Sequence, residues 1–148
     1  VKDAIRDGLR AVKNLIEDKC VVPGAGAFEI AAYRRLQEYK VEVEGKEKLG
    51  VSAFADSLLI IPKTLAENSG HDVYKTLLSV IDAAQTNTQN KHLLGIDLLT
   101  GNPNVPAIEG IWDNYRVKRQ MLSLAPTLAQ QLLLVDEVLK AGKSMTKN

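Results

Sequence analysis

The sequence predicts a mainly α-helical fold with a small β-hairpin insert. Apolar residues recur every three or four positions along most of the 148 residues, which is the spacing of one face of an α-helix. One stretch breaks this period: near residue 100, a Thr-Gly-Asn-Pro turn separates two short apolar runs. That pattern is typical of a hairpin. The sequence shows no internal repeat and no low-complexity segment.

The first helix is expected at residues 3–19, where one face is apolar and the other faces are charged. The members of the apolar face are Ala4, Leu9, Val12, Leu15 and Ile16. The segment 20–26 ends this helix, because Pro23 cannot stand in a helix interior. A second helix is expected at about 25–40, with Glu29 favourably placed in its positively polarised first turn.

The middle of the chain predicts a connection and then a helix buried at the centre of the core. Residues 41–48 are charged and suit an exposed connection. Residues 49–61 are apolar on nearly every side, which is typical of a central core helix. Pro62 interrupts this helix. A short helix then runs through Glu67 and stops at Gly70, which suits a C-cap.

The next helix begins after Asp72, which is a good N-cap residue. Its apolar face consists of Val73, Leu77, Val80, Ile81 and Ala84. A polar loop is expected at 86–91. Residues 92–99 and 105–112 then predict the two arms of a short hairpin or irregular β insert, joined by the turn at 100–103.

A long last helix is expected at about 115–141, after an N-cap offered by Asp113 and Asn114. Its apolar residues are Val117, Met121, Leu124, Leu128, Leu132, Val135 and Leu139. Pro126 should kink it, and Gly142 should close it. A thin polar tail follows.

Composition excludes several classes of partner. The 19 basic and 18 acidic residues leave a net charge of +1, so no single-sign field favours nucleic acid or an anionic membrane. The longest uncharged run, 120–135, is shorter than the roughly 20 residues that span a bilayer. The two histidines and Cys20 lie far apart in the sequence and show no metal-ligand spacing.

The lone Cys20 cannot form an internal disulfide, which predicts a reducing, intracellular setting. Beside two valines, it is expected to be a small buried hydrophobe. The chain starts at Val1 rather than at methionine, and the helical pattern begins almost at once. We therefore expect a piece of a longer protein.

The run Gly24, Ala25 and Gly26 stands at the entrance of the second helix. Small residues there let the backbone approach a phosphate, and the helix dipole favours negative charge. A dinucleotide fingerprint fits badly, because Glu29 stands where a third glycine is needed and no βαβ unit follows. A P-loop is excluded, since no Gly-Lys-Ser/Thr is present. On the residues alone, an ordinary loop-to-helix turn is the favoured interpretation.

Two acids have both a plain and a chemical interpretation. Asp7 lies one helical turn after Asp3, and the pair can be a solvated helix face or can include a carboxylate that orients water for attack on phosphorus. Asp113 can cap the last helix, accept hydrogen bonds from sugar hydroxyls, or do both.

His71 and His92 are expected at the surface, with no catalytic role.

Five runs of the sequence, in order, resemble the group II chaperonins, among them the subunits of the eukaryotic cytosolic ring complex, TRiC. These runs are DGLRAVKN, VVPGAGAFE, AFADSLLIIPKTLAENSGHD, LLGIDLLTG and GIWDNYRVKRQ. The likeness covers essentially the whole chain, and its block at 53–72 is highly specific. It implies that 1–20 is the end of an intermediate domain, and that 21–148 is the C-terminal half of the equatorial, ATP-binding domain, a helical bundle.

The resemblance also implies roles for residues that are weak candidates alone. Asp7 corresponds to the intermediate-domain aspartate that activates the hydrolytic water. Gly24, Ala25 and Gly26 correspond to the glycine-rich turn that lines the nucleotide pocket. That turn is usually three glycines, so the methyl group of Ala25 is a departure that would crowd the nucleotide or slow turnover.

Three further residues correspond to the nucleoside side of that pocket. The resemblance places Gly95 and Asp97 on the segment near the adenine. It places Asp113 on the acidic residue that holds the ribose. The residue after that acid is usually proline, and Asn114 departs from this pattern, which puts the rigidity of the ribose contact in doubt.

The implied function is that of an ATP-dependent chaperone subunit in the cytoplasm. Its cofactors would be ATP and Mg²⁺, and its partners would be sister subunits in a hetero-oligomeric double ring and unfolded client proteins, with no nucleic acid and no membrane. Nothing in this sequence matches the family's Gly-Asp-Gly-Thr phosphate loop, its Mg²⁺-holding aspartate or its apical client-binding domain. The isolated chain is therefore predicted to be inactive in ATP hydrolysis and to self-associate through exposed apolar surface.

Two alternatives remain open at this point. A non-catalytic helical scaffold could bind a partner through apolar helix faces and handle no nucleotide. A catalytically slow subunit, marked by Ala25, could bind ATP without brisk turnover.

Overall fold

The computed structural model describes residues 1–86 and 93–140. In chain order, its elements are α1 (Lys2–Asp18), β1 (Val21–Pro23), α2 (Ala27–Glu42), α3 (Glu47–Leu58), α4 (Ile60–Asn68), α5 (Val73–Thr86), β2 (Gly95–Ile96), β3 (Pro103–Asn104), α6 (Pro106–Glu109), β4 (Trp112–Asn114) and α7 (Tyr115–Leu133). The predicted mainly α-helical class is confirmed.

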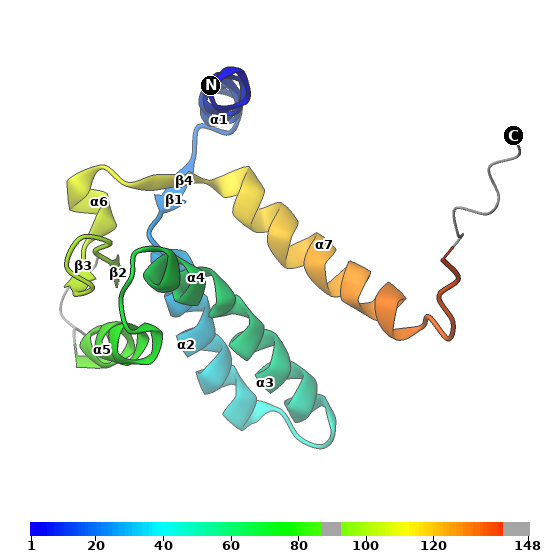
Figure 1. Ribbon diagram of the computed structural model, residues 1–148. Coiled ribbons are helices and arrows are strands. Elements are labelled where there is room, and N and C mark those ends of the chain that lie inside the picture. Colours follow the sequence, from blue (N-terminus) through cyan, green and yellow to red (C-terminus); the bar gives the residue numbers. More distant parts are fainter. Residues whose placement is uncertain (87–92, 141–148) are drawn as a thin grey trace, which may run out of the picture.

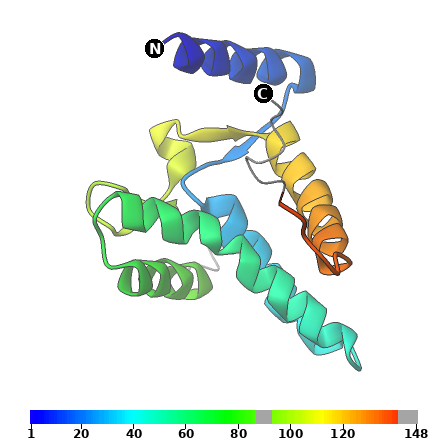
Figure 2. The ribbon, with the colours of Figure 1, turned by 45° about the vertical axis from the view of Figure 1, so that its right-hand side comes forward.

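The molecule has a helical body, a narrow connection and a separate helix above it (Figure 1). The body contains α2 to α6, and β1 and β4 form the connection that leads from it to α1. Figure 2 shows α1 standing apart from the body, while α7 leaves the connection and runs downward. Within the part of the chain that the structure describes, α1 has no buried residue.

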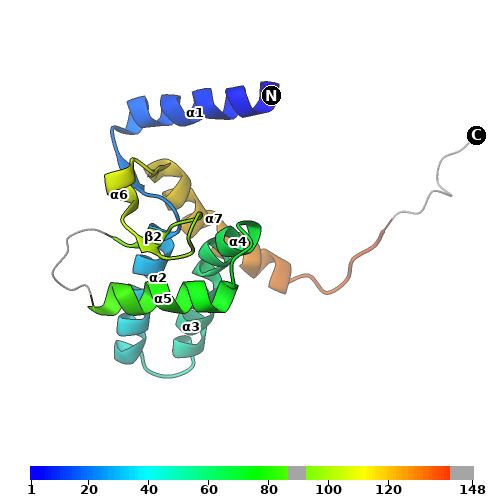
Figure 3. The same ribbon diagram turned by 60° about the vertical axis from the view of Figure 1, so that its left-hand side comes forward.

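The core of the body lies where α2, α4, α5 and β2 meet. Its fully packed members are Ile30, Ala66, Val80, Leu94 and Ile96. Val73, Ile81 and Ala84 of the predicted α5 face pack against this cluster from one side, as the helical period requires. Figure 3 shows α5 below β2, with α4 beside it.

Helix boundaries in the body follow local signals. The Asp72 carboxylate accepts a hydrogen bond from the Lys75 N–H at 2.8 Å, which confirms it as the α5 N-cap. Gly70 has φ of 76° just after α4, which confirms the predicted glycine stop. The chain turns between α3 and α4 at Leu59, three residues before Pro62.

Two pairs of short antiparallel strands hold the loops. In the first, Val21 pairs with Asn114 and Pro23 with Trp112. In the second, Gly95 pairs with Asn104 and Ile96 with Pro103. The second pair confirms part of the predicted hairpin insert. The first joins segments about ninety residues apart in the sequence, and local pattern did not predict it.

The expectation of a central core helix at 49–61 was wrong. Only Ala55 and Leu58 of α3 are buried, while Leu49 is 73% exposed. The reason is that α3 forms a hairpin with α2 at the edge of the body. One side of α3 is therefore covered, while Leu49 and Ala53 are exposed.

Within residues 1–86 and 93–140, one helical stretch is long and apolar enough to cross a membrane by length and composition. It is Glu47–Asn68. This stretch is α3 and α4 together, interrupted at Leu59.

Two expectations for the second half of the chain need correction. The second predicted arm, 105–112, is not a strand: it forms the short helix α6 and the start of β4, because Pro106 suits a first helical turn. The last helix ends at Leu133 rather than near 141, and 134–140 is irregular and exposed. Pro126 lies inside α7, and the kink expected there stays a prediction. Gly142, the polar tail and most of the predicted 86–91 loop lie outside the described residues.

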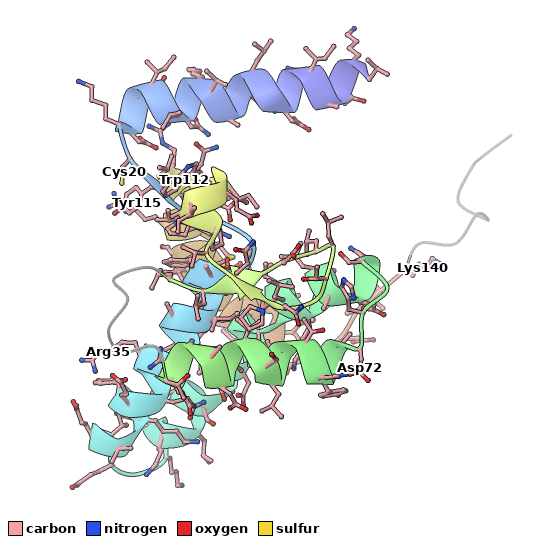
Figure 4. All side chains as sticks on the ribbon, turned by 90° about the vertical axis from the view of Figure 1, so that its left-hand side faces the viewer. Cys20, Arg35, Asp72, Trp112, Tyr115 and Lys140 are labelled. Carbon is pink, nitrogen blue, oxygen red and sulfur yellow. The ribbon has the colours of Figure 1, made fainter. Side chains whose placement is uncertain are left out.

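Cys20 is exposed, which corrects the expectation that it is buried. Figure 4 shows it with Trp112 and Tyr115 at the connection below α1, away from Arg35, Asp72 and Lys140. The cause is that the connection consists of two three-residue strands, which offer little packing surface.

Candidate functional site

The pairing of β1 with β4 brings the small-residue turn against Asp113. Val22 lies opposite Asp113 in the strand register, and the next residues of β1 lead directly into the turn. The Gly24 N–H donates to the Ile111 carbonyl at 3.1 Å. A Cβ atom on Gly24 would lie 3.1 Å from Ile111 Cγ2 and 3.3 Å from Asp113 Oδ1. A glycine here therefore leaves room for that carboxylate.

The turn itself has an unusual backbone. Ala25 and Gly26 both have positive φ, of 53° and 75°. The left-handed region costs a non-glycine residue roughly 1–2 kcal/mol, so Ala25 is strained. A Cβ on Gly26 would lie 2.9 Å from Pro62 Cβ. These two conformations delay the start of α2 to Ala27, two residues after the predicted start.

A second close approach holds β2 against the turn. The Ile96 N–H donates to the Ala25 carbonyl at 3.0 Å. A Cβ on Gly95 would lie 2.7 Å from that same carbonyl oxygen and 2.9 Å from Pro106 Cγ. Both neighbours are rigid, so this position requires glycine. The contact between β2 and the turn thus depends on Gly95.

The turn, β2 and β4 surround a cavity of about 500 Å³. Four of the predicted site residues line it: Ala25, Gly26, Asp97 and Asp113. Gly24 and Gly95 lie immediately behind the lining, through the contacts given above. The apolar walls are formed by Ile61, Leu65, Ile96, Leu98, Leu99 and Ile111. All six residues expected to bind a cofactor are therefore in one place.

The charge of this cavity is acidic. Asp97, Glu109 and Asp113 line it, and the described lining includes no lysine or arginine. Carboxylates accept hydrogen bonds from hydroxyl and amino groups, but they repel phosphate. At one edge, α2 begins after Gly26, and no side chain of the described residues caps it. The cavity thus suits an apolar ring with hydroxyl groups better than a triphosphate.

The Asp97 carboxylate organises its own turn. Its Oδ2 accepts from the Thr100 hydroxyl at 2.6 Å, and its Oδ1 accepts from the Leu99 N–H at 2.9 Å. The hydrogen bond from Thr100 is the main cause that lowers the pKa of Asp97, and the one from the Leu99 N–H adds to it. The side chain therefore lines the cavity while it holds the β2–β3 connection.

Asp113 is not the N-cap that its position before the last helix predicted. It lies within β4, and the cap residue is Asn114, whose side chain makes no capping hydrogen bond in the described part of the chain. The Asp113 carboxylate instead pairs with Lys118, with Oδ2 to Nζ at 2.8 Å. Strand pairing with β1 decides this orientation.

Lys118 and Glu29 form an ion pair that the sequence did not predict. Glu29 is fully buried and Lys118 is 8% exposed. Burial by itself would lower the pKa of Lys118, but hydrogen bonds to Asp113 and Glu29 outweigh it, so that the pKa is raised. Neither the place of Glu29 in a helical first turn nor a lone lysine 89 positions later carries a local signal for the pair.

Asp7 does not lie with the other predicted residues. It is exposed on α1 and is not among the described residues that line the cavity. His71 is partly exposed, and its Nε2 is 2.9 Å from the Leu98 carbonyl. His92 lies outside the described residues. Among those that are described, no group of three or more His, Cys, Asp or Glu side chains converges as a metal site.

Sequence comparison assigns the family. The TCP-1/cpn60 chaperonin family matches residues 1–143. The chain belongs to this family.

Individual chaperonins agree with this assignment along nearly the whole chain. The chain is 54% identical to T-complex protein 1 subunit zeta-2 of Mus musculus over 149 residues, and 54% identical to that of Homo sapiens over 147. These matches cover 100% and 99% of the chain but 27% of each relative. The chain therefore spans about a quarter of the length of the curated relatives it matches.

A solved structure agrees at the level of fold. The open state monomer of a group II chaperonin from Methanococcoides burtonii superimposes with a TM-score of 0.77 at 30% identity, over 90% of this chain and 33% of that one. The resemblance to group II chaperonins is confirmed, and both relatives are subunits of the zeta type, which the five quoted runs also indicate. Membership of a chaperonin family disfavours the scaffold alternative.

Proposed function

We propose that this chain is part of an ATP-dependent chaperone subunit, and that the cavity beside the Gly24–Gly26 turn receives the nucleoside end of ATP. The observation that carries this proposal is the convergence of six residues from three distant stretches on one cavity. Apolar walls with a few well-placed polar groups are typical of a small-molecule site.

Each part of the cavity has a role in this proposal. The apolar walls hold the adenine ring. Asp113 accepts a hydrogen bond from a ribose hydroxyl, since an ionised carboxylate is a strong acceptor. The backbone of the turn and the start of α2 lie on the side from which the phosphates leave, where helix N–H groups favour an anion. The three carboxylates of the lining disfavour phosphate inside the cavity itself.

The triphosphate and Mg²⁺ are therefore bound mainly by residues outside this chain. Phosphoryl transfer needs several positive charges around the γ-phosphate and its metal. The only charged side chains in the described lining are carboxylates. We accordingly expect no measurable hydrolysis from the isolated chain, and hydrolysis only by the full-length subunit in its assembly.

Asp7 supplies the water-orienting carboxylate in that assembly. In this proposal, residues 1–20 end an intermediate domain and 21–148 form the C-terminal half of the equatorial domain. Asp7 is exposed on α1, which is joined to the body through the β1–β4 connection. A movement of α1 toward the bound nucleotide would couple hydrolysis to closure of the subunit.

The wider setting follows from the family. Sister subunits in a hetero-oligomeric double ring are the assembly partners, and non-native polypeptides are the clients, bound outside this chain. A cytosolic location agrees with a single free cysteine, Cys20.

The test uses the full-length subunit in its assembled ring and measures ATP affinity and ATP hydrolysis separately. Asp113→Ala should weaken ATP binding about tenfold or more, because it removes a hydrogen bond to a charged acceptor. Asp7→Ala should retain binding and lose hydrolysis. Asp56→Ala, at an exposed acid of α3, is the matched control. Binding by the Asp113 variant that equals that of the Asp56 variant would contradict the proposal.

A further inference from the structure

We propose that Lys118 is a positioning residue for the nucleotide site: it holds one oxygen of Asp113 so that the other remains available to a ribose hydroxyl. This inference rests on the proposed function, in which Asp113 is the ribose acceptor. Lys118 does not itself line the cavity, so it acts through Asp113.

The geometry separates the two oxygens of the Asp113 carboxylate. Oδ2 lies 2.8 Å from Lys118 Nζ. Oδ1 lies on the side of the small-residue turn, 3.3 Å from where a Cβ of Gly24 would stand. With Oδ2 held by the ammonium group, the carboxylate cannot rotate freely. Oδ1 is then the oxygen presented to a ligand.

The lysine is anchored by a second acid. Lys118 Nζ also pairs with Glu29 Oε1, and Glu29 is fully buried. A buried carboxylate without a counter-ion is very costly, so this pair keeps Lys118 charged and in place. Glu29 Oε2 has no hydrogen-bond partner among the described residues. The ammonium group is therefore the principal partner of this carboxylate.

The three side chains come from three elements that meet at the site. Glu29 is in the first turn of α2, Asp113 is in β4, and Lys118 is in the first turn of α7. One ammonium between two carboxylates leaves a net charge of −1 on the group. Asp113 therefore remains a negatively charged acceptor at the cavity, and Glu29 and Lys118 serve to orient it.

The experiment measures how strongly the assembled full-length ring prefers ATP over 2′-deoxy-ATP and 3′-deoxy-ATP. We expect the wild type to prefer ATP about tenfold over the analogue that lacks the bound hydroxyl. Asp113→Ala should abolish this preference. Lys118→Met should reduce it to about threefold or less, and Lys118→Arg should restore most of it. Arg119→Met, at an exposed cation of the same helix, should leave it unchanged.

A merely structural role of Lys118 would lower thermal stability without changing the preference between ATP and its analogues. If Lys118→Met retains the tenfold preference while Asp113→Ala loses it, the positioning role is overturned and the proposed function stands. If Asp113→Ala retains the preference, the assignment of Asp113 fails, and this inference fails with it. If Lys118→Met does not assemble, Lys118→Gln is measured in the same way: a lost preference supports the role, and a retained one overturns it.

Discussion

The body around the cavity and the helix α1 show opposite relations between sequence and packing. The body brings together residues from 24–26, 95–97 and 111–113, and several of its contacts leave no room for one additional carbon atom. In α1 the apolar residues recur at regular helical spacing, yet Leu9 is 67% exposed and Ile16 is 68% exposed. An amphipathic pattern thus predicts an apolar helix face, but it does not predict that residues of the same chain pack against that face.

The largest expected effect on stability is at Gly95 in the body. Gly95→Ala should lower the free energy of unfolding by about 3 kcal/mol, because its new Cβ would stand 2.7 Å from the Ala25 carbonyl oxygen. Chemical denaturation of the full-length subunit measures this. Gly50→Ala in α3, where nothing lies within 4 Å, is the control and should raise stability by about 0.5–1 kcal/mol. Equal effects at the two positions would contradict the close packing of β2 against the turn.

A smaller effect of opposite sign is expected at Ala25. Ala25→Gly relieves left-handed strain of about 1–2 kcal/mol, offset by about 0.5–1 kcal/mol of added chain entropy. The net result should be a gain in stability of up to about 1.5 kcal/mol, with ATP turnover faster than in the wild type. Denaturation and a phosphate-release assay on the full-length ring measure the two quantities.

The control for Ala25 is Ala31→Gly in the interior of α2, where φ is helical. That variant should lose about 1 kcal/mol instead. A loss of stability at both positions would show that the positive φ of Ala25 is not strained. Faster turnover without greater stability would indicate that the methyl group crowds the nucleotide but costs the fold nothing.

The smallest expected effect on stability is in α1. Leu9→Glu with Ile16→Glu should change the stability of the isolated chain by no more than about 0.5 kcal/mol, because neither side chain is buried. The same pair should reduce self-association, since it breaks the exposed apolar face. Light scattering should find oligomers of the wild-type chain and a lower mass for the variant. A wild-type chain that is cleanly monomeric would contradict this prediction.

Much of the local structure could be predicted from the sequence because its signals are local. Asp72 and Gly70 mark helix ends through interactions within one turn, and the structure has both. The break expected at Pro62 lies at Leu59 instead, and Pro62 is inside α4. The end of the last helix was not predicted, because residues 134–140 carry an apolar pattern without packing partners among the described residues. The predicted burial of 49–61 was wrong because α3 packs against α2 at the edge of the body, which the apolar pattern alone does not reveal.

The site was only partly predictable, since strand pairing across ninety residues assembles it. The residue types at 24–26 and 113 suggested a turn and a cap separately, and the resemblance to chaperonins was needed to join them. Because β4 pairs with β1, Asp113 lies in a strand and lines the cavity, and it does not cap α7. Lys118 and Glu29 meet only in three dimensions, so neither spacing nor composition pointed to their pairing.

The most direct test of the central claim is a structure of the assembled full-length ring with a non-hydrolysable ATP analogue and Mg²⁺. The adenine should lie between the apolar walls of this cavity, with a ribose hydroxyl within hydrogen-bond distance of Asp113. The phosphates should extend past the Gly24–Gly26 turn to groups outside this chain. A nucleotide bound elsewhere, or phosphates inside the cavity beside Asp97 and Glu109, would contradict it.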